Sequence, residues 1–567
     1  MPKKSSLIKH ILFGELKYID YDGQAEPAIE DDRVGLTVAV SLNKAYSCND
    51  FKIRITRGTE AILIDAVNAD TKKLNTPKGK FLHFRLDDLA CKEIYSYELL
   101  YKNNPLIINN KATPPADTQV FIRTPPARQD PQPIKIAVGG DQERHEQFNP
   151  IGACFGLDSQ QYTQLLYQHI GITGTSNAMD AGIDEQPYHM VIHLGDLFNG
   201  EWFLSFSNLF RPDRKIVERN VQSIDAFRYH ISDDFSKPVG TNLARVPGFY
   251  AVADDHDIGQ NNAAPPTTQK QFDARNNMQN AFHEAVLSPQ FLPQKKGPYY
   301  TKRIGQHEFF FLHNRYTQEN NDEYHLLGKA QWNWLKLSLS ESKASNKVLV
   351  TPLPLVMGKN PTEDYRGHGN EWHNLMQLCR TYKISTVLAG DSHNYSESEI
   401  HVRQSVDDAP FIVHQYLVGT LGGSAQHVTD DELKCINQPG HPPLMPKNGE
   451  FDPMLYQGSS VKAYFSPGDN NAFLPVSATD SQWTQPGEWS NGTFAYQQII
   501  CVPVSTDENP QDEDIRELSD GSFEQQVHLS PVKHAMPWQV RACLFTCNKK
   551  SDGVSHEPRL DSSYTTG

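Results

Sequence analysis

Residues 250–263 read YAVADDHDIGQNNA, a short apolar run that ends in three carboxylates and one imidazole. The apolar letters predict a buried strand, with Asp254, Asp255, His256 and Asp257 placed directly at its end. Burying like charges side by side costs several kcal/mol unless a cation or hydrogen bonds compensate them. A bound metal ion would compensate them, and a turn open to solvent would avoid the cost. This stretch alone leaves both alternatives open.

Three further apolar runs in the sequence end in the same way. The runs IAVGG, VIHLG and TVLAG are followed at once by Asp141, Asp196 and Asp391, and His393 comes two residues after the last of these. A glycine before each aspartate lets the backbone turn sharply. Because the carboxyl ends of parallel strands converge, we expect these carboxylates to gather in one place. One or two divalent cations there would offset their repulsion.

From residue 134 onward, apolar runs alternate with stretches of helical apolar spacing, which predicts an α/β domain. The expected strands are IKIAVGG, HMVIHLG, GFYAVA, EFFFLH, KVLVTPL and STVLAG. The expected helices are residues 159–170, 223–235, 270–287, 329–342 and 370–383.

Residues 1–125 instead contain short runs of β-branched and aromatic residues, separated at regular intervals by turn-forming residues. This pattern predicts an N-terminal β-sandwich of immunoglobulin-like size. The proline-rich stretch TPPARQDPQP, residues 124–133, predicts a linker to the α/β domain at 134–503. Residues 504–567 form an acidic segment that we expect to be partly ordered. In it PWQVRACLFTC predicts a strand, and the last fifteen residues are expected to be disordered.

The composition argues against some classes of function. The 567 residues carry a formal charge of -15, which disfavours a broad nucleic-acid-binding surface. No apolar run reaches the roughly 20 residues that span a bilayer, and we find no clear signal peptide. The eight cysteines are scattered without a CxxC pair, which favours reduced structural thiols. We expect a cytoplasmic protein, or one exported without a recognisable N-terminal signal, and the oligomeric state stays open.

The motifs GGDQE, HLGDLFNGE, ADDHDIGQNN, FFFLHNRY, VTPLPL and AGDSHNY follow one another along residues 134–400. In this order they resemble the PhoD-like alkaline phosphatases and phosphodiesterases of the calcineurin-like metallophosphoesterase superfamily. The resemblance includes the preceding β-sandwich and linker, and so covers most of residues 1–420. It implies a metal-dependent phosphatase or phosphodiesterase. Its catalytic domain would be an α/β sandwich, two mixed sheets flanked by helices.

The resemblance also implies roles for individual residues. The implied ligands of two metal ions are Asp141, Asp196, Asn199, Asn261, Asp391 and His393, with Asp196 between the ions. The implied catalytic and substrate-binding residues are His256, Asp255, Arg315 and Asn262. His256 would face the leaving-group oxygen, oriented by Asp255 or Asp257, and Arg315 would face the phosphate. Asp254 is expected to shape the turn or to support the ligands, and His193 to be structural.

Two positions differ from the pattern of the family. Asp141 stands where members often have a cysteine, and Asn199 stands where they often have a tyrosine that binds ferric iron. We therefore expect two divalent ions, drawn from Mg, Mn, Ca, Zn and Fe, in place of a ferric site. Two such ions would clamp a phosphate oxygen and activate a water for in-line attack, while His256 protonates the departing alkoxide.

Two functions remain open from the sequence. The favoured one is hydrolysis of phosphate monoesters, phosphate diesters or both. The alternative is a catalytically weak or inactive relative that acts as a binding or scaffold protein through its β-sandwich. The first is favoured because the implied bridging carboxylate, Asp196, and the implied proton donor, His256, are both present.

Overall fold

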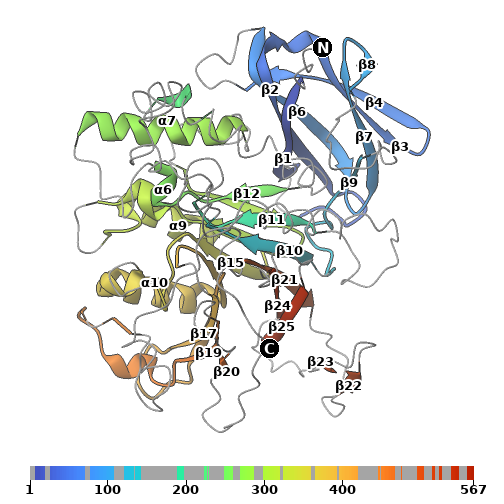
Figure 1. The fold of residues 1–567 in the computed structure, drawn as a ribbon. Coiled ribbons are helices and arrows are strands. Elements are labelled where there is room, and N and C mark those ends of the chain that lie inside the picture. The colour runs from blue at the N-terminus through green and yellow to red at the C-terminus, as the bar shows by residue number, and fades with distance from the viewer. Residues whose placement is uncertain are drawn as a thin grey trace, which may run out of the picture.

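The computed structural model of the chain describes residues 7–19, 26–69, 77–106, 120–132, 134–141, 188–196, 223–225, 228, 248–258, 268–285, 298–319, 324–358, 364–392, 395–418, 445–446, 448–465, 474–475, 494–503, 514–517, 523–526, 538–547 and 559–566. These residues form two antiparallel sheets near the N-terminus and two larger mixed sheets (Figure 1). A small ribbon pairs β22 (Asp514–Glu517) with β23 (Phe523–Gln526). Among the described residues, no helix is long and apolar enough to cross a membrane.

The N-terminal part contains antiparallel strands where the sequence predicts them. One sheet has the order β1 (Ile8–Tyr18), β2 (Arg33–Ser47), β6 (Lys78–Ala90) and β5 (Val67–Asn68). The other has the order β4 (Glu60–Asp65), β3 (Phe51–Arg57), β7 (Ile94–Tyr101) and β8 (Asn104–Pro105), with β9 (Val120–Arg123) also against β7. Buried and half-buried residues alternate along β3, where Phe51, Ile53 and Ile55 enter the core.

The rest of the chain builds two mixed sheets. The six-stranded sheet has the order β12 (Phe249–Ala251), β11 (Met190–His193), β10 (Ile134–Gly139), β21 (Phe494–Pro503), β24 (Trp538–Cys547) and β25 (Arg559–Thr566). The eight-stranded sheet has the order β13 (Tyr300–Ile304), β14 (His307–Phe311), β15 (Asn346–Thr351), β16 (Thr386–Ala389), β18 (Phe411–Leu417), β17 (Tyr395–Val402), β19 (Ser460–Phe465) and β20 (Leu474–Pro475). The strands that precede the four aspartate motifs lie in parallel sets. In the six-stranded sheet β10, β11 and β12 are parallel, and in the eight-stranded sheet β14, β15, β16 and β18 are parallel.

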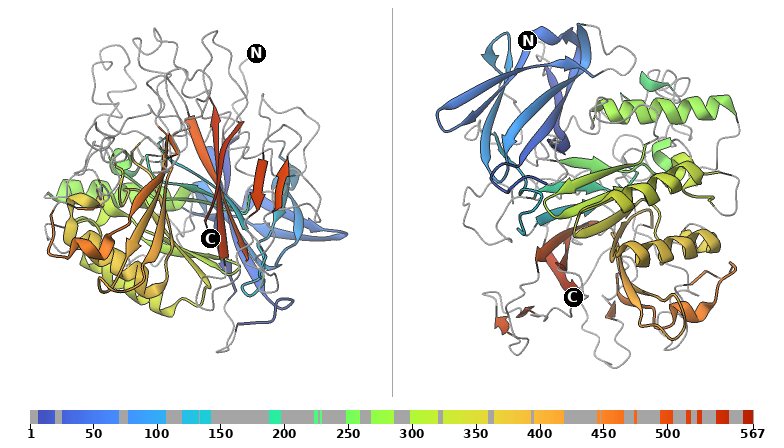
Figure 2. Two further views of the ribbon diagram at one scale, coloured as in Figure 1. Left: turned by 90° about the horizontal axis from the view of Figure 1, so that it is seen from below. Right: turned by 180° about the vertical axis from the view of Figure 1, so that it is seen from behind.

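The eight-stranded sheet is covered on both faces, which explains its nearly continuous apolar strands. Val348, Val350 and Leu388 lie in a core shared with the six-stranded sheet, whereas Leu349 and Val387 face the helices. These helices are α9 (Gly328–Glu341) and α10 (Gly369–Tyr382), which lie along one side of the sheet (Figure 2). The other described helices are α6 (Asp255–Ile258), α7 (Gln269–Ala285), α8 (Asn314–Thr317) and the 3-10 helices η1 (Cys48–Asp50), η6 (Tyr365–Gly367) and η7 (Pro453–Tyr456).

The helices expected near 270–287, 329–342 and 370–383 are thus confirmed as α7, α9 and α10. The helix expected at 159–170 lies outside the described residues, and of 223–235 only residues 223–225 and 228 are described.

The C-terminal segment corrects one expectation. The strand predicted from PWQVRACLFTC is confirmed as β24, which pairs with β21 of the six-stranded sheet. The expected disorder of the last fifteen residues is wrong for Arg559–Thr566, which form β25 antiparallel to β24, and the other residues of that stretch lie outside the described residues. The reason is that β24 would otherwise present an open edge, whose backbone groups β25 satisfies. A short and mostly polar segment can therefore be ordered by strand pairing.

Strand β1 of the N-terminal part contacts β12, the strand that leads into Asp254. The backbone N–H of Leu16 donates to the hydroxyl of Tyr250 at 2.8 Å, and this bond is buried. Two residues later on β1, the hydroxyl of Tyr18 accepts from the N–H of Gly305 at 2.7 Å and donates to the carbonyl of Pro126. The N-terminal sheets are therefore hydrogen-bonded directly to the strand that carries the acidic motif.

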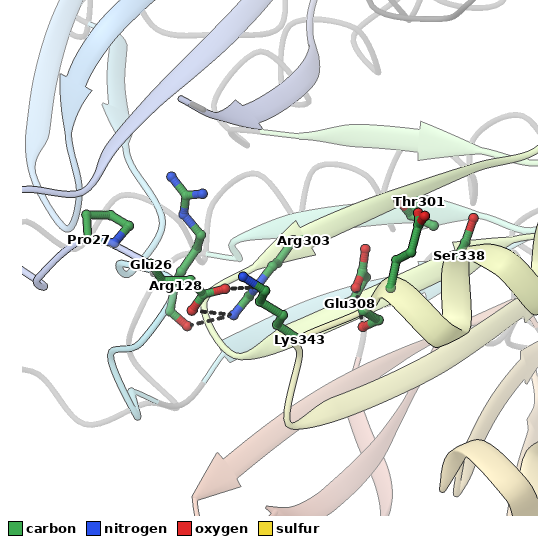
Figure 3. Close-up of a pocket in the computed structure, with 10 residues that line it drawn as sticks. Glu26, Pro27, Arg128, Thr301, Arg303, Glu308, Ser338 and Lys343 are labelled. Atoms are coloured by element: carbon green, nitrogen blue, oxygen red, sulfur yellow. Dashed lines mark hydrogen bonds and ion pairs between the residues drawn. The ribbon is translucent and has the colours of Figure 1, made fainter. Parts of the chain in front are cut away.

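A polar cleft of about 300 Å³ lies at this same boundary (Figure 3). It is lined by Glu26, Pro27, Arg128, Thr301, Arg303, Glu308, Ser338, Glu341, Ser342 and Lys343. Arg303 forms an ion pair with Glu26 and also donates to the carbonyl of Arg128 at 3.2 Å. Glu308 accepts a hydrogen bond from Ser342. Because these polar groups bind one another, we interpret the cleft as a seam between the two parts of the fold.

Replacing Tyr250 with Phe removes the hydroxyl that accepts from Leu16 and leaves a buried backbone donor unpaired. We expect the free energy of unfolding to fall by about 1–3 kcal/mol, the usual cost of such a donor. Urea unfolding followed by circular dichroism measures the change. The control is Tyr46→Phe, whose part-buried hydroxyl makes a 3.3 Å contact with Asn43. An equal loss in both variants would contradict the bracing role of Tyr250.

Candidate metal centre

Each of the four aspartate motifs begins directly beyond the end of a parallel strand. Asp141 follows β10, Asp196 follows β11, Asp254 follows β12 and Asp391 follows β16. Three of these residues have left-handed backbones, with φ of 52° at Asp141, 51° at Asp196 and 70° at Asp391. A non-glycine residue in this region is strained by about 1–2 kcal/mol. Strain repeated at equivalent positions indicates that the surrounding fold forces these carboxylates toward a common point.

The glycines before the aspartates allow the strand ends to approach closely. A Cβ atom on Gly195, where φ is +112°, would lie 2.7 Å from the Cβ of Asp254. A Cβ atom on Gly390 would lie 2.9 Å from the Cβ of Leu194. Gly390 follows β16 of the eight-stranded sheet and Leu194 follows β11 of the six-stranded sheet, so the convergence occurs between two sheets and not at one edge of a single sheet.

Three buried carboxylates form the closest group at this meeting point. Asp196, Asp254 and Asp255 each offer an oxygen, and these oxygens all lie within 4.8 Å of one another. The Oδ2 atom of Asp254 is buried and accepts no hydrogen bond from the described residues. Carboxylate oxygens suit hard divalent cations such as Mg²⁺, Mn²⁺ and Ca²⁺. The side chains present therefore fit a metal ion, because a cation would satisfy the buried oxygen and relieve the crowding of negative charge.

The pKa values of Asp196 and Asp391 reflect the same repulsion between buried carboxylates. Burial raises the pKa of Asp196 well above its usual range, and the carboxylates of Asp255, Asp254 and Asp141 raise it further. Burial and then Asp254 raise the pKa of Asp391, although Arg315 lowers it in part. Without added positive charge, these carboxylates cannot all ionise at neutral pH.

Arg315 brings a positive charge into this group from α8. Its Nε donates to Oδ1 of Asp254 at 2.8 Å, and its Nη2 lies 3.7 Å from Oδ1 of Asp391 and 3.9 Å from Oδ2 of Asp255. Burial alone would lower the pKa of Arg315, but these three carboxylates outweigh it and the pKa is raised. The guanidinium is therefore charged throughout the accessible pH range.

The short helix that carries Arg315 is held by a buried polar network. The amide nitrogen of Asn314 donates to the Tyr365 hydroxyl at 2.8 Å, and its amide oxygen accepts from Thr351 at 3.1 Å. The backbone N–H of His313 donates to the side chain of Gln331 at 2.9 Å. These bonds tie α8 to β15, η6 and α9, so the backbone of Arg315 is fixed relative to the eight-stranded sheet.

The structure brings together a subset of the residues expected at the site. Asp141, Asp196, Asp255, Asp391 and Arg315 lie at the meeting point of the two sheets. The backbone of His256 lies in α6, but the position of its side chain is not described. Four further expected residues lie outside the described residues: Asn199, Asn261, Asn262 and His393.

Asp254 is the residue whose importance the sequence analysis missed. Expected to shape a turn or to support the ligands, it is fully buried and belongs to the closest carboxylate group. The signal that could have revealed it is the pair of adjacent aspartates, Asp254 and Asp255, after the buried strand β12. Helix α6 begins at Asp255, and both side chains are buried. Asp257, which was expected to orient His256, accepts from the N–H of Asp254 at 2.9 Å. His193 is fully buried beside Phe249, and burial lowers its pKa to about 3, so its ring is neutral.

Comparisons with known proteins point to one family. Residues 160–433 match the family model described as PhoD-like phosphatase. Among solved structures, "Structure of PhoD" is 15% identical with a TM-score of 0.53, and the match covers 100% of this chain and 94% of the other. A purple acid phosphatase, PPD1, from yellow lupin (Lupinus luteus) seeds is 12% identical with a TM-score of 0.47, over 94% of this chain and 72% of the other. A comparison with curated proteins gives no match.

A thermal shift should reveal a bound cation. For protein stripped with a chelator, we expect Mn²⁺ at about a hundred times its Kd to stabilise the fold by about 2.7 kcal/mol. Differential scanning calorimetry measures the corresponding rise in Tm. Asp254→Asn should lose most of the rise, and the exposed-site control Asp65→Asn should keep it. An unchanged Tm in the unsubstituted protein would exclude a metal site of this affinity.

Glu397 is a buried acid on β17, outside the carboxylate group, and burial raises its pKa from 4.5 to about 8. The unfolded chain releases this proton near pH 4.5 and the folded chain near pH 8, so unfolding is favoured as the pH rises between these values. We therefore expect Glu397→Gln to raise Tm more at pH 8 than at pH 5. The matched control is Glu399→Gln on the same strand. A Tm difference that does not change with pH would contradict this prediction.

Proposed function

We propose that this phosphoester hydrolase cleaves phosphate monoesters, diesters or both with two divalent metal ions, since residues 160–433 match the family model described as PhoD-like phosphatase. The observation that carries this proposal is the convergence of buried carboxylates with Arg315 between two sheets. Such a group has a high electrostatic cost, which bound cations and an anionic substrate would offset.

We propose the following assignment of the chain's residues. Asp196, Asp141 and His393 would hold one ion, and Asp196, Asp391, Asn261 and Asn199 would hold the other. Asp254 and Asp255 are added to this set as nearby carboxylates, since both approach Asp196. When bound, the ions would supply activation of a water nucleophile and charge neutralisation at the phosphate. Mg, Mn, Ca, Zn and Fe all remain candidates.

Three residues of the chain would act on the substrate directly. Arg315 carries a planar guanidinium that can bind two phosphate oxygens at once. His256 would donate a proton to the departing alkoxide, because it follows the buried Asp255 at the start of α6. Asn262 would add a hydrogen bond to the phosphate. The charge of Arg315 and the proton of His256 are thus assigned to different oxygens of the ester.

The scaffold alternative has less support. A protein that served only as a binding partner would gain nothing from strained, buried aspartates, which reduce stability. In this chain Asp141, Asp196 and Asp391 all have positive φ angles and so carry that strain. We therefore favour catalysis over a binding role for the N-terminal sheets.

We further propose the organisation and setting of the chain. Residues 1–125 would be an immunoglobulin-like β-sandwich domain and 134–503 the catalytic domain, with 504–567 completing its six-stranded sheet through β24 and β25. We propose a cytoplasmic location, or export without a recognisable N-terminal signal. The partner would be a phosphate-ester substrate and not a nucleic acid bound over a broad surface.

Hydrolysis of an aryl phosphomonoester and an aryl phosphodiester tests the proposal. The assay would use Mg²⁺, Ca²⁺, Mn²⁺, Zn²⁺ and Fe²⁺ in turn, from pH 5 to 10. We expect metal-dependent turnover that Asp196→Asn reduces at least about a hundredfold, since it removes a charge at the centre of the cluster. The exposed Asp65→Asn should retain full turnover. Undiminished activity in Asp196→Asn would overturn the assignment. The preference of the unsubstituted protein for the monoester or the diester would identify the substrate class.

A further inference from the structure

Arg315 lies where a metal ion would also be attracted. Its guanidinium approaches Asp254, Asp255 and Asp391. Asp254 and Asp255 belong to the group of three close carboxylates described above. We propose that Arg315 is a built-in counter-cation of this acidic group, which neutralises Asp255 and Asp391 in the metal-free protein and competes with metal for them. This inference rests on the metal site of the proposed function.

The three contacts of the guanidinium are unequal. The bond from Nε to Asp254 has hydrogen-bond length at 2.8 Å, whereas Nη2 lies 3.7 Å from Asp391 and 3.9 Å from Asp255. The last two distances exceed a direct hydrogen bond, so those contacts are electrostatic. Arg315 is therefore anchored at Asp254 through its inner nitrogen Nε, and its outer nitrogen Nη2 makes the two weaker contacts that a competing cation can replace.

The anchor itself is rigid. Asp254 is fully buried, and its N–H is bonded to Asp257 at 2.9 Å. The backbone of α8 is held by Asn314 and His313, as described above. Any change in the contacts of Arg315 with Asp255 and Asp391 therefore involves only the outer end of the guanidinium or movement of those carboxylates.

The charges decide the direction of the effect. In the metal-free protein, one buried guanidinium offsets part of the repulsion among the carboxylates. When a divalent cation enters, the same guanidinium repels it, and this repulsion is weakly screened because Arg315 is only 6% exposed. Removing the positive charge should thus strengthen metal binding in the absence of substrate. A residue that only bound the phosphate would leave that affinity unchanged.

The test is the affinity for Mn²⁺ of metal-free, substrate-free protein, measured by isothermal titration calorimetry at one pH. Arg315→Met and Arg315→Gln remove the charge, and Gln keeps a donor that can reach Asp254. We expect both to bind Mn²⁺ at least about tenfold more tightly. Arg315→Lys keeps the charge and should stay within about threefold of the unsubstituted protein. The control Arg54→Met, which removes an arginine paired with Glu98, should bind as the unsubstituted protein does.

Circular dichroism without and with Mn²⁺ guards against a folding defect. An uncharged variant that is unfolded without metal and folds when Mn²⁺ is added would support the inference, because the ion then replaces the missing charge. Equal or weaker Mn²⁺ binding by both uncharged variants would overturn it, as would failure of both to fold in Mn²⁺ while Arg315→Lys folds. Absence of Mn²⁺ binding by the unsubstituted protein would instead overturn the metal site of the proposed function.

Discussion

The crowding of carboxylates between the two mixed sheets is the constraint on which the rest of the site depends. Asp196, Asp254 and Asp255 lie close together and are buried, and Asp141 and Asp391 add to the negative charge around them. Without added positive charge, these carboxylates cannot all be ionised at neutral pH. The fold must therefore supply positive charge, and the features around the cluster are explained by that need.

Close packing keeps the cluster together. Gly195 and Gly390 leave no room for a side chain, so strand ends from the two sheets approach within van der Waals distance. The left-handed backbones of the aspartates after them turn the carboxylates into the gap. The strain and the repulsion are balanced by apolar cores on both faces of the eight-stranded sheet. This is an arrangement in which binding chemistry is maintained at the expense of local stability.

The N-terminal sheets contribute to the site at a distance. Leu16 binds Tyr250, which lies on β12 four residues before Asp254, and Tyr18 joins β1 to Gly305 next to β13. The polar seam around Arg303 and Glu26 continues this contact. The N-terminal part is therefore bonded both to β12, which leads into Asp254, and to β13 of the sheet to which α8 and Arg315 are fixed. The geometry between Asp254 and Arg315 thus depends on how the two parts pack.

The sequence by itself indicated the strand–aspartate motifs and the alternation of strands and helices, because these follow from local patterns of apolar, glycine and charged residues. The choice of Asp141, Asp196, Asp255, Asp391 and Arg315 as site residues came from the resemblance to the PhoD-like family, and it stays a prediction. The sequence also indicated the strand at residues 538–547. It did not reveal the role of Asp254 or the strand Arg559–Thr566, since the first depends on which side chains meet across two sheets and the second on an edge that a distant strand offers. Only the tertiary structure decided that one arginine would face three aspartates, because ion pairing between residues 60 or more positions apart is a property of packing and leaves no periodic trace in the chain.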